Sequence, residues 1–263
     1  MSEVLNVARE GGVTRVTLTR PEVHNAFNAR LIDALHEAFT VLASEPPEAL
    51  RTVVLAGEGA SFCAGADIAW QRGAMALSTA ENEADAGRLQ QMLTAIDECP
   101  APVVARVHGV ALGGGMGLCA VADVVLAAAG TTFGFTETKL GIMPAVISPF
   151  VLAKIGETHA RALFPTGERF SAERAREIGL VHEVLPDVAA VDARVEQVVH
   201  ELLLAGPTAA RGAKAVIRDQ RGLPRADALA LGVERAARQR VSPEGQEGLT
   251  AFLDKRRPSW TRD

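Results

Sequence analysis

The chain has 263 residues, 48% of them hydrophobic, and a formal net charge of −5. This composition is typical of a folded globular chain with one well-filled core, and the negative charge argues against nucleic acid as a partner. Aromatic residues make up only 4% and Tyr is absent, which weakens any function based on stacking against bases.

The cysteines and the apolar segments indicate the compartment. Cys63, Cys99 and Cys119 are odd in number and show no CxxC spacing, which favours a reducing environment. The first residues, MSEVLNVAREGG, are neither basic nor apolar enough for a secretory signal. No stretch approaches the ~20 apolar residues of a membrane span. We therefore expect a cytoplasmic protein with no membrane partner.

The elements expected in chain order alternate between strand and helix. The expected strands are residues 13–19, 52–56, 103–107 and 124–128. Helices are expected at residues 28–43 and 80–98, and the second of these is polar on one side. A further helix is expected after the glycines at 113–115, and nearly everything from Ala172 onward is expected to be helical. This order predicts an α/β fold with a largely parallel sheet, whose ligand-binding loops lie at the carboxyl ends of the strands.

Two glycine-rich turns, AGAD at 64–67 and GGG at 113–115, each follow an expected strand. Glycines provide no side chain and weaken a helix, so three in a row indicate that the backbone approaches something closely. Two N–H groups that converge at one end of the sheet, one of them at a helix N-terminus, would form an oxyanion hole. The alternative is a pair of tight strand-to-helix turns with no ligand.

Other motif classes do not fit. The next acid after GGGMG, Asp123, comes far sooner than the ~20 residues expected in a dinucleotide-binding fingerprint, and no P-loop lysine follows. No GxSxG hydrolase motif occurs. The six histidines show no metal-binding spacing, so we expect no metal site.

Six segments, in order, resemble the crotonase (enoyl-CoA hydratase/isomerase) superfamily. They are LTRPEVHNAFN (18–28), SFCAGADI (61–68), HGVALGGGMGL (108–118), FGFTETKLGIMPA (133–145), GERFSAERAREIGLVHEVLP (167–186) and FLDKRRPSW (252–260). The resemblance implies the ββα spiral core of ClpP/crotonase-like proteins at 1–186, followed by a helical trimerisation or lid region at 187–263. It also implies an acyl-CoA substrate and no separate cofactor, because CoA enters with the substrate. A homo-trimer or hexamer is implied as well, and a role in fatty acid or branched-chain amino acid catabolism.

The resemblance also implies roles for single positions. Ala66 and Gly114 would donate the oxyanion-hole N–H groups, and Glu137 would exchange a proton with the substrate. Burial behind FGF and before LGIMPA is expected to raise the pKa of Glu137 toward neutrality. Lys255 would meet the CoA phosphates, unless it is simply a solvated helix end. The residues expected to border the CoA or acyl group are Val23, His24, Ala64, Asp67, Ile68 and Gly113.

Gly117 departs from the family pattern, in which hydratases carry a second catalytic glutamate three residues after the oxyanion glycine. A hydratase divides its work between two carboxylates, one acting on water and one on the C2 proton. We favour a hydratase/dehydratase, because residues 137–156 resemble bacterial methylglutaconyl-CoA hydratases; Lys139 and Arg72 would then pair with the distal carboxylate. The alternatives are a Δ3-Δ2 enoyl-CoA isomerase, which uses a single glutamate, and a non-catalytic acyl-CoA-binding scaffold.

Overall fold

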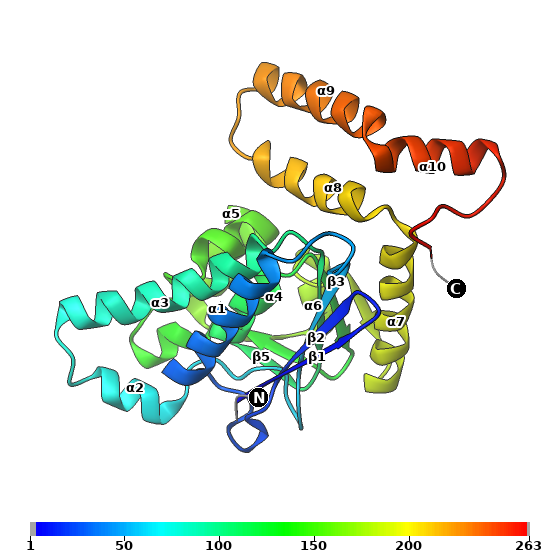
Figure 1. Cartoon of the computed structure of the whole chain (residues 1–263). Coiled ribbons are helices and arrows are strands. Elements are labelled where there is room, and N and C mark those ends of the chain that lie inside the picture. The colour runs from blue at the N-terminus through cyan, green and yellow to red at the C-terminus, as the bar shows by residue number, and fades with distance from the viewer. Residues whose placement is uncertain (1–3, 262–263) are drawn as a thin grey trace.

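A computed structural model describes residues 4–261, which form an α/β core and a projecting arm of three helices (Figure 1). The core contains a six-stranded sheet with the order β1-β2-β3-β4-β6-β9 and a three-stranded sheet with the order β5-β7-β8. The first sheet consists of β1 (Leu5–Glu10), β2 (Val13–Leu18), β3 (Thr52–Gly57), β4 (Val103–Val107), β6 (Val124–Ala128) and β9 (Glu183–Leu185). The second consists of β5 (Val110–Leu112), β7 (Thr132–Gly134) and β8 (Arg169–Ser171).

The parallel arrangement expected from the sequence is confirmed for most of the larger sheet. Strands β2, β3, β4, β6 and β9 run parallel in turn, whereas β1 joins β2 as an antiparallel hairpin. The expected strands at 103–107 and 124–128 have the observed bounds. The expectation that nearly everything after Ala172 is helical is confirmed for the described residues, with β9 as the exception; a three-residue strand is too short to show a periodic pattern.

The larger sheet is covered by helices on both faces because its central strands are apolar on both sides. Leu55 and Val103 face the main core, where they pack with the buried apolar residues of the helices on that side of the sheet. Val54 and Val104 point the other way, against the buried stripe of the helix after β9, whose apolar residues recur every fourth position. The helices of the main core are α1 (Ala29–Ala43), α3 (Thr79–Asp97), α4 (Gly114–Val121) and α5 (Ser148–Thr166), and the helix on the opposite face is α7 (Val188–Leu204).

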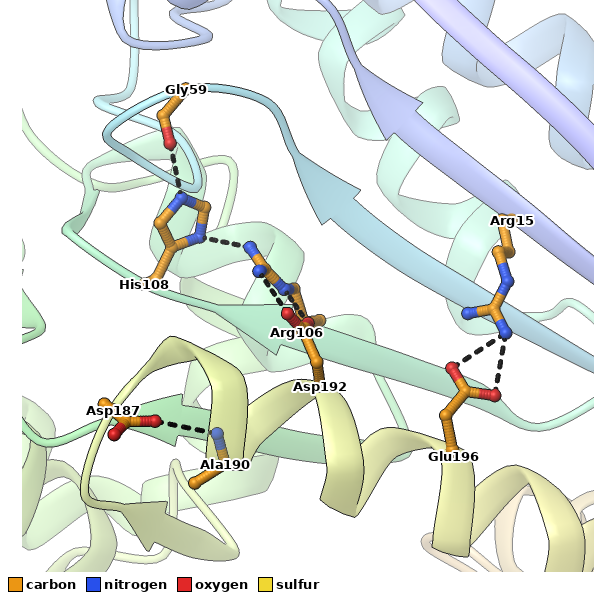
Figure 2. A network of polar contacts seen from close by, with 8 residues as sticks. All are labelled: Arg15, Gly59, Arg106, His108, Asp187, Ala190, Asp192 and Glu196. Atoms are coloured by element: carbon orange, nitrogen blue, oxygen red, sulfur yellow. Dashed lines mark hydrogen bonds and ion pairs between the residues drawn. The ribbon is translucent and has the colours of Figure 1, made fainter.

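Charged side chains also fasten α7 to the sheet, as Figure 2 shows. Arg106 of β4 makes an ion pair with Asp192 of α7 at 2.7 Å, and Arg15 of β2 pairs with Glu196 at 2.8 Å. Helix α7 lies within the helical region predicted at 187–263, and its apolar face packs against the core. The helices that leave the core therefore begin after α7.

The arm consists of α8 (Pro207–Asp219), α9 (Arg225–Val241) and α10 (Pro243–Leu253), which lie away from the sheets (Figure 1). Its first helix is tied to the core, because Lys214 pairs with Asp123 at 2.7 Å and Arg211 donates a hydrogen bond to the Glu45 carbonyl. Large apolar side chains of the arm are exposed, among them Ile217, Leu229, Val233, Val241, Phe252 and Leu253. Subunit contacts through the arm remain a prediction.

The remaining elements are short: the 3₁₀ helices η1 (Pro21–Val23) and η2 (Thr136–Leu140), and the helices α2 (Ile68–Ala74) and α6 (Ala172–Glu177). Within residues 4–261, no helix combines the length and the apolar character needed to cross a bilayer. The three cysteines are buried free thiols. Burial raises the pKa of the Cys63 thiol to about 12, which makes it a poor nucleophile.

Candidate active site

The two glycine-rich turns lie side by side because the segments leading into them pair with each other. The Cys63 N–H donates to the Val110 carbonyl at 3.1 Å, and the Leu112 N–H donates back to the Cys63 carbonyl at 3.0 Å. The Gly113 N–H then donates to the Gly134 carbonyl of β7 at 2.9 Å. The chain therefore enters AGAD and GGG along adjacent, parallel paths.

A buried histidine holds the loop before the first turn. His108 lies just before β5, its Nε2 is 2.8 Å from the Gly59 carbonyl, and its Nδ1 is 2.9 Å from the Arg106 guanidinium (Figure 2). The carbonyl requires a donor and the guanidinium requires an acceptor, so the ring is neutral with its proton on Nε2. Burial, with Arg106 nearby, lowers the pKa of His108 and stabilises this neutral form.

The glycines are needed because their backbones approach other groups too closely for a side chain. A Cβ on Gly65, whose φ is +90°, would lie 2.8 Å from the Leu112 carbonyl oxygen and 3.4 Å from the Gly114 nitrogen. A Cβ on Gly114 would lie 2.6 Å from two ring carbons of buried Phe27. Gly65 can therefore approach the second turn, and Gly114 the Phe27 ring, only because neither glycine has a side chain.

The backbone N–H groups of Ala66 and Gly114 are both without a backbone acceptor among residues 4–261. The neighbours of Ala66 are occupied, because the Phe27 N–H donates to Gly65 and the Asp67 N–H donates to Phe27, at 2.6 and 2.8 Å. Gly114 is the first residue of α4, where an N–H has no acceptor within the helix. Ala66 and Gly114 line one cavity of about 270 Å³, so two donors are available to an oxyanion there.

The walls of this cavity are mainly apolar, formed by residues such as Phe27, Trp70, Leu89, Val146 and Ile147. A wider and more open hollow of about 790 Å³ lies beside Arg106 and His108, but these two side chains are already paired. We therefore place the site in the smaller cavity, where the unpaired donors are.

Glu137 lies on η2 in the wall of this cavity, next to the glycine turn. A Cβ built on Gly113 would lie 3.4 Å from its Oε1, and its Oε2 is buried with no hydrogen-bond partner among residues 4–261. Burial raises the pKa of Glu137, as expected from its apolar flanks, with a hydrogen bond from its own backbone N–H acting in the opposite direction. A carboxyl group whose pKa is raised in this way is suited to holding and exchanging a proton.

Gly117 faces an apolar side chain where the family pattern places its second glutamate. A Cβ on Gly117 would lie 2.7 Å from Ile147 Cγ2 and 3.4 Å from Leu93 Cδ1. Both neighbours are buried, and Ile147 lies at the beginning of α5. The space is therefore filled by a packed isoleucine rather than left as an open slot.

Some of the other residues predicted to contact CoA or substrate line the cavity, and others do not. Ala64 and Gly113 line the cavity. The Asp67 carboxylate instead pairs with Arg20 at 2.7 Å and caps α2 through the Ala69 N–H at 2.8 Å. Burial opposes ionisation of Asp67, but these hydrogen bonds outweigh it and lower its pKa.

The more distant predicted residues lie on the surface. Ile68 is 80% exposed, Val23 is half-buried, and exposed His24 has its Nδ1 2.9 Å from the Ser61 hydroxyl. Lys255 follows α10 on the arm and does not line the cavity of its own chain (Figure 1). Lys139 and Arg72 do not line it either. The predicted contacts of Val23, His24, Ile68 and Lys255 with CoA, and of Lys139 and Arg72 with a distal substrate carboxylate, remain predictions.

Sequence reasoning did not single out several side chains of the cavity wall. They are Phe27, Trp70, Gln71, Asn82, Asp85 and Ile147. Asn82 and Asp85 belong to the polar side of the helix expected at 80–98, a pattern that by itself looks the same as a solvent-facing surface. Across the described ranges, no group of three His, Cys, Asp or Glu side chains is placed to hold a metal ion.

Comparisons with known proteins show the family and the fold. Residues 8–263 match the family model "Enoyl-CoA hydratase/isomerase". A probable enoyl-CoA hydratase of Rhodobacter capsulatus is 35% identical over 95% of both chains. The crystal structure of an enoyl-CoA hydratase from Shewanella pealeana has a TM-score of 0.93 and 34% identity, covering 98% of this chain and 96% of that one. Pseudomonas aeruginosa AtuE has a TM-score of 0.95 and 35% identity, covering 99% and 100%. The chain belongs to the enoyl-CoA hydratase/isomerase family and has the crotonase fold.

Proposed function

We propose that the protein is a hydratase/dehydratase of an enoyl-CoA thioester. The observation that supports this most is that the free N–H groups of Ala66 and Gly114 line one cavity with half-buried Glu137. The thioester oxygen would accept hydrogen bonds from both N–H groups, which stabilise the negative charge of an enolate. Glu137 would deliver the proton to C2 during hydration and remove it during dehydration.

A second candidate function is the Δ3-Δ2 isomerase. The packing of Ile147 beside Gly117 favours it, because the place of the family's second glutamate is filled while Glu137 adjoins Gly113. One carboxylate suffices to move a proton from C2 to C4 through the same enolate. The isomerase needs no group that activates water, whereas the hydratase does.

A panel of CoA esters analysed by mass spectrometry distinguishes these functions. It contains saturated, 3-enoyl, crotonyl and branched glutaconyl-CoA esters, the last because residues 137–156 resemble hydratases of such substrates. We expect the mass of one water to be added to at least one 2-enoyl ester. Conversion of 3-enoyl esters without a mass change would support the isomerase instead. Binding without turnover on every ester would support the non-catalytic scaffold.

Restoring the missing glutamate tests how the site handles water. Gly117→Glu alone is expected to misfold locally, because its Cβ would lie 2.7 Å from Ile147. The double variant Gly117→Glu/Ile147→Ala removes this contact, and Ile147→Ala alone is the matched control. A positioned acid–base group contributes about 10²–10⁴-fold, so we expect crotonyl-CoA hydration by the double variant to exceed the control at least about tenfold. A folded double variant no faster than the control would contradict this expectation.

A further inference from the structure

Helix α3 carries a second carboxylate into the cavity that contains Glu137. Asn82, Asp85, Ala86 and Leu89 of α3 all line the cavity, at the i, i+3, i+4, i+7 spacing of a single helix face. One turn further along this face, Leu93 lies beside Gly117. The face is therefore apolar where it passes Gly117 and polar farther toward the start of the helix.

The start of α3 is held firmly, so the position of Asp85 is well defined. Ser78 and Glu81 form a capping box, in which the Ser78 N–H donates to the Glu81 carboxylate at 2.8 Å. The Asn82 amide donates to the Leu77 and Ala74 carbonyls at 3.2 and 3.3 Å, which joins α3 to the end of α2. Both helices contribute to the cavity wall, so these contacts also set its shape.

The surroundings of Asp85 suit a group that binds water. Its side chain is 18% exposed and accepts one hydrogen bond, from Arg88 at 3.3 Å. An ionised carboxylate has about four acceptor positions and no donor, so it orients a bound water with a proton toward itself and the oxygen lone pairs away. Glu137 and Asp85 are the ionisable side chains in the cavity wall across residues 4–261.

We propose that Asp85 is the second carboxylate of the site, holding and deprotonating the water that adds to the substrate. This inference rests on the hydratase function proposed above. Asp85 would supply from α3 the group that Gly117 cannot supply from α4. The site would then use two carboxylates from different elements, while Ile147 fills the space beside Gly117.

The proposed step balances in atoms and charge. The water oxygen forms a bond to C3 while one of its protons passes to Asp85. The electron pair of the C2–C3 double bond moves into the enolate, whose oxygen is held by Ala66 and Gly114. Protonated Glu137 then gives its proton to C2. The proton gained by Asp85 leaves to solvent and another returns to Glu137, which resets both groups.

The competing explanation is that Asp85 serves only as one half of a helical ion pair with Arg88. Such exposed i, i+3 pairs contribute little to stability. Asp33 provides a matched control, because it lies 3.7 Å from the same arginine but does not line the cavity. A purely structural role predicts similar behaviour for Asp85→Asn and Asp33→Asn.

The experiment separates water addition from proton exchange at C2. Hydration of the 2-enoyl ester accepted by the wild type is measured beside deuterium uptake at C2 of butyryl-CoA in D₂O, which needs no water addition. We expect Asp85→Asn to lower the hydration kcat at least about 10²-fold, with C2 exchange within about twofold of the wild type. Asp33→Asn should leave both rates unchanged.

Equal losses of hydration and exchange in Asp85→Asn, or no loss of hydration, would overturn the assignment. If Asp85→Asn unfolds, Asp85→Ala is tested with added formate, and failure of formate to restore hydration in folded protein overturns it equally. Failure of the proposed function looks different, because the wild type would then add water to none of the esters.

Discussion

Glu137→Gln is expected to lower turnover by about 10³-fold or more, because glutamine cannot exchange a proton and the other carboxylate of the cavity wall, Asp85, is proposed to act on water. Deuterium uptake at C2 of butyryl-CoA should fall to the same extent as hydration, since both reactions need the C2 proton to move. Binding of the CoA ester should remain within a few-fold, because glutamine has nearly the same shape. Hydration close to the wild-type rate would refute the role of Glu137.

Stability provides the control for this variant. Burial raises the pKa of Glu137, so its ionised form is less favourable in the folded protein than in the unfolded chain. The contribution of this carboxyl group to stability is therefore present at low pH and is lost as pH rises through its folded-state pKa. Glutamine stays neutral, so the unfolding temperature of Glu137→Gln should match or exceed that of the wild type at neutral pH.

Gly114→Ala is expected to give the second-largest loss, about 10²-fold in kcat. The added Cβ would lie 2.6 Å from two carbons of the buried Phe27 ring, and we expect the backbone of Gly114 to shift in response. That shift moves an N–H donor whose value depends on its exact aim at the oxyanion, and losing one such donor typically costs about 10²–10³-fold. Steady-state kinetics and CoA-ester binding together measure the effect.

Gly87→Ala is the matched control for this substitution. Gly87 lies within α3, and a Cβ there meets nothing within 4 Å, so the change adds the same methyl group without a clash. Alanine favours a helix over glycine by roughly 1 kcal/mol, so this control should be at least as stable as the wild type. If Gly114→Ala folds with normal kcat, Gly114 does not donate to the transition state.

The sequence predicted the elements with a long enough pattern to read. Strands β4 and β6 are five residues each and buried on both faces, and their β-branched runs gave their bounds directly. Strand β9 is only three residues long, and its pairing with β6 depends on contacts nearly sixty residues apart. Local periodicity contains no information about such a contact.

The same distinction applies to the site. The glycine turns were found because a run of glycines is costly unless the backbone approaches something closely, and the observed contacts of Gly65 and Gly114 are of that kind. The burial of Glu137 followed from its apolar neighbours. Asp85 was missed because a polar face on a helix has the same pattern whether it meets water or a cavity.

The contact between Gly117 and Ile147 also limits how this chain can change by mutation. A glutamate at 117 alone would collide with Ile147, while a small residue at 147 alone would leave a cavity, which typically costs about 2–5 kcal/mol. Either single change is therefore unfavourable, and only the pair admits a carboxylate at this position. A lineage carrying this glycine and isoleucine together would have to cross a fitness valley to regain a glutamate, so its catalytic apparatus is more easily elaborated elsewhere in the cavity than restored.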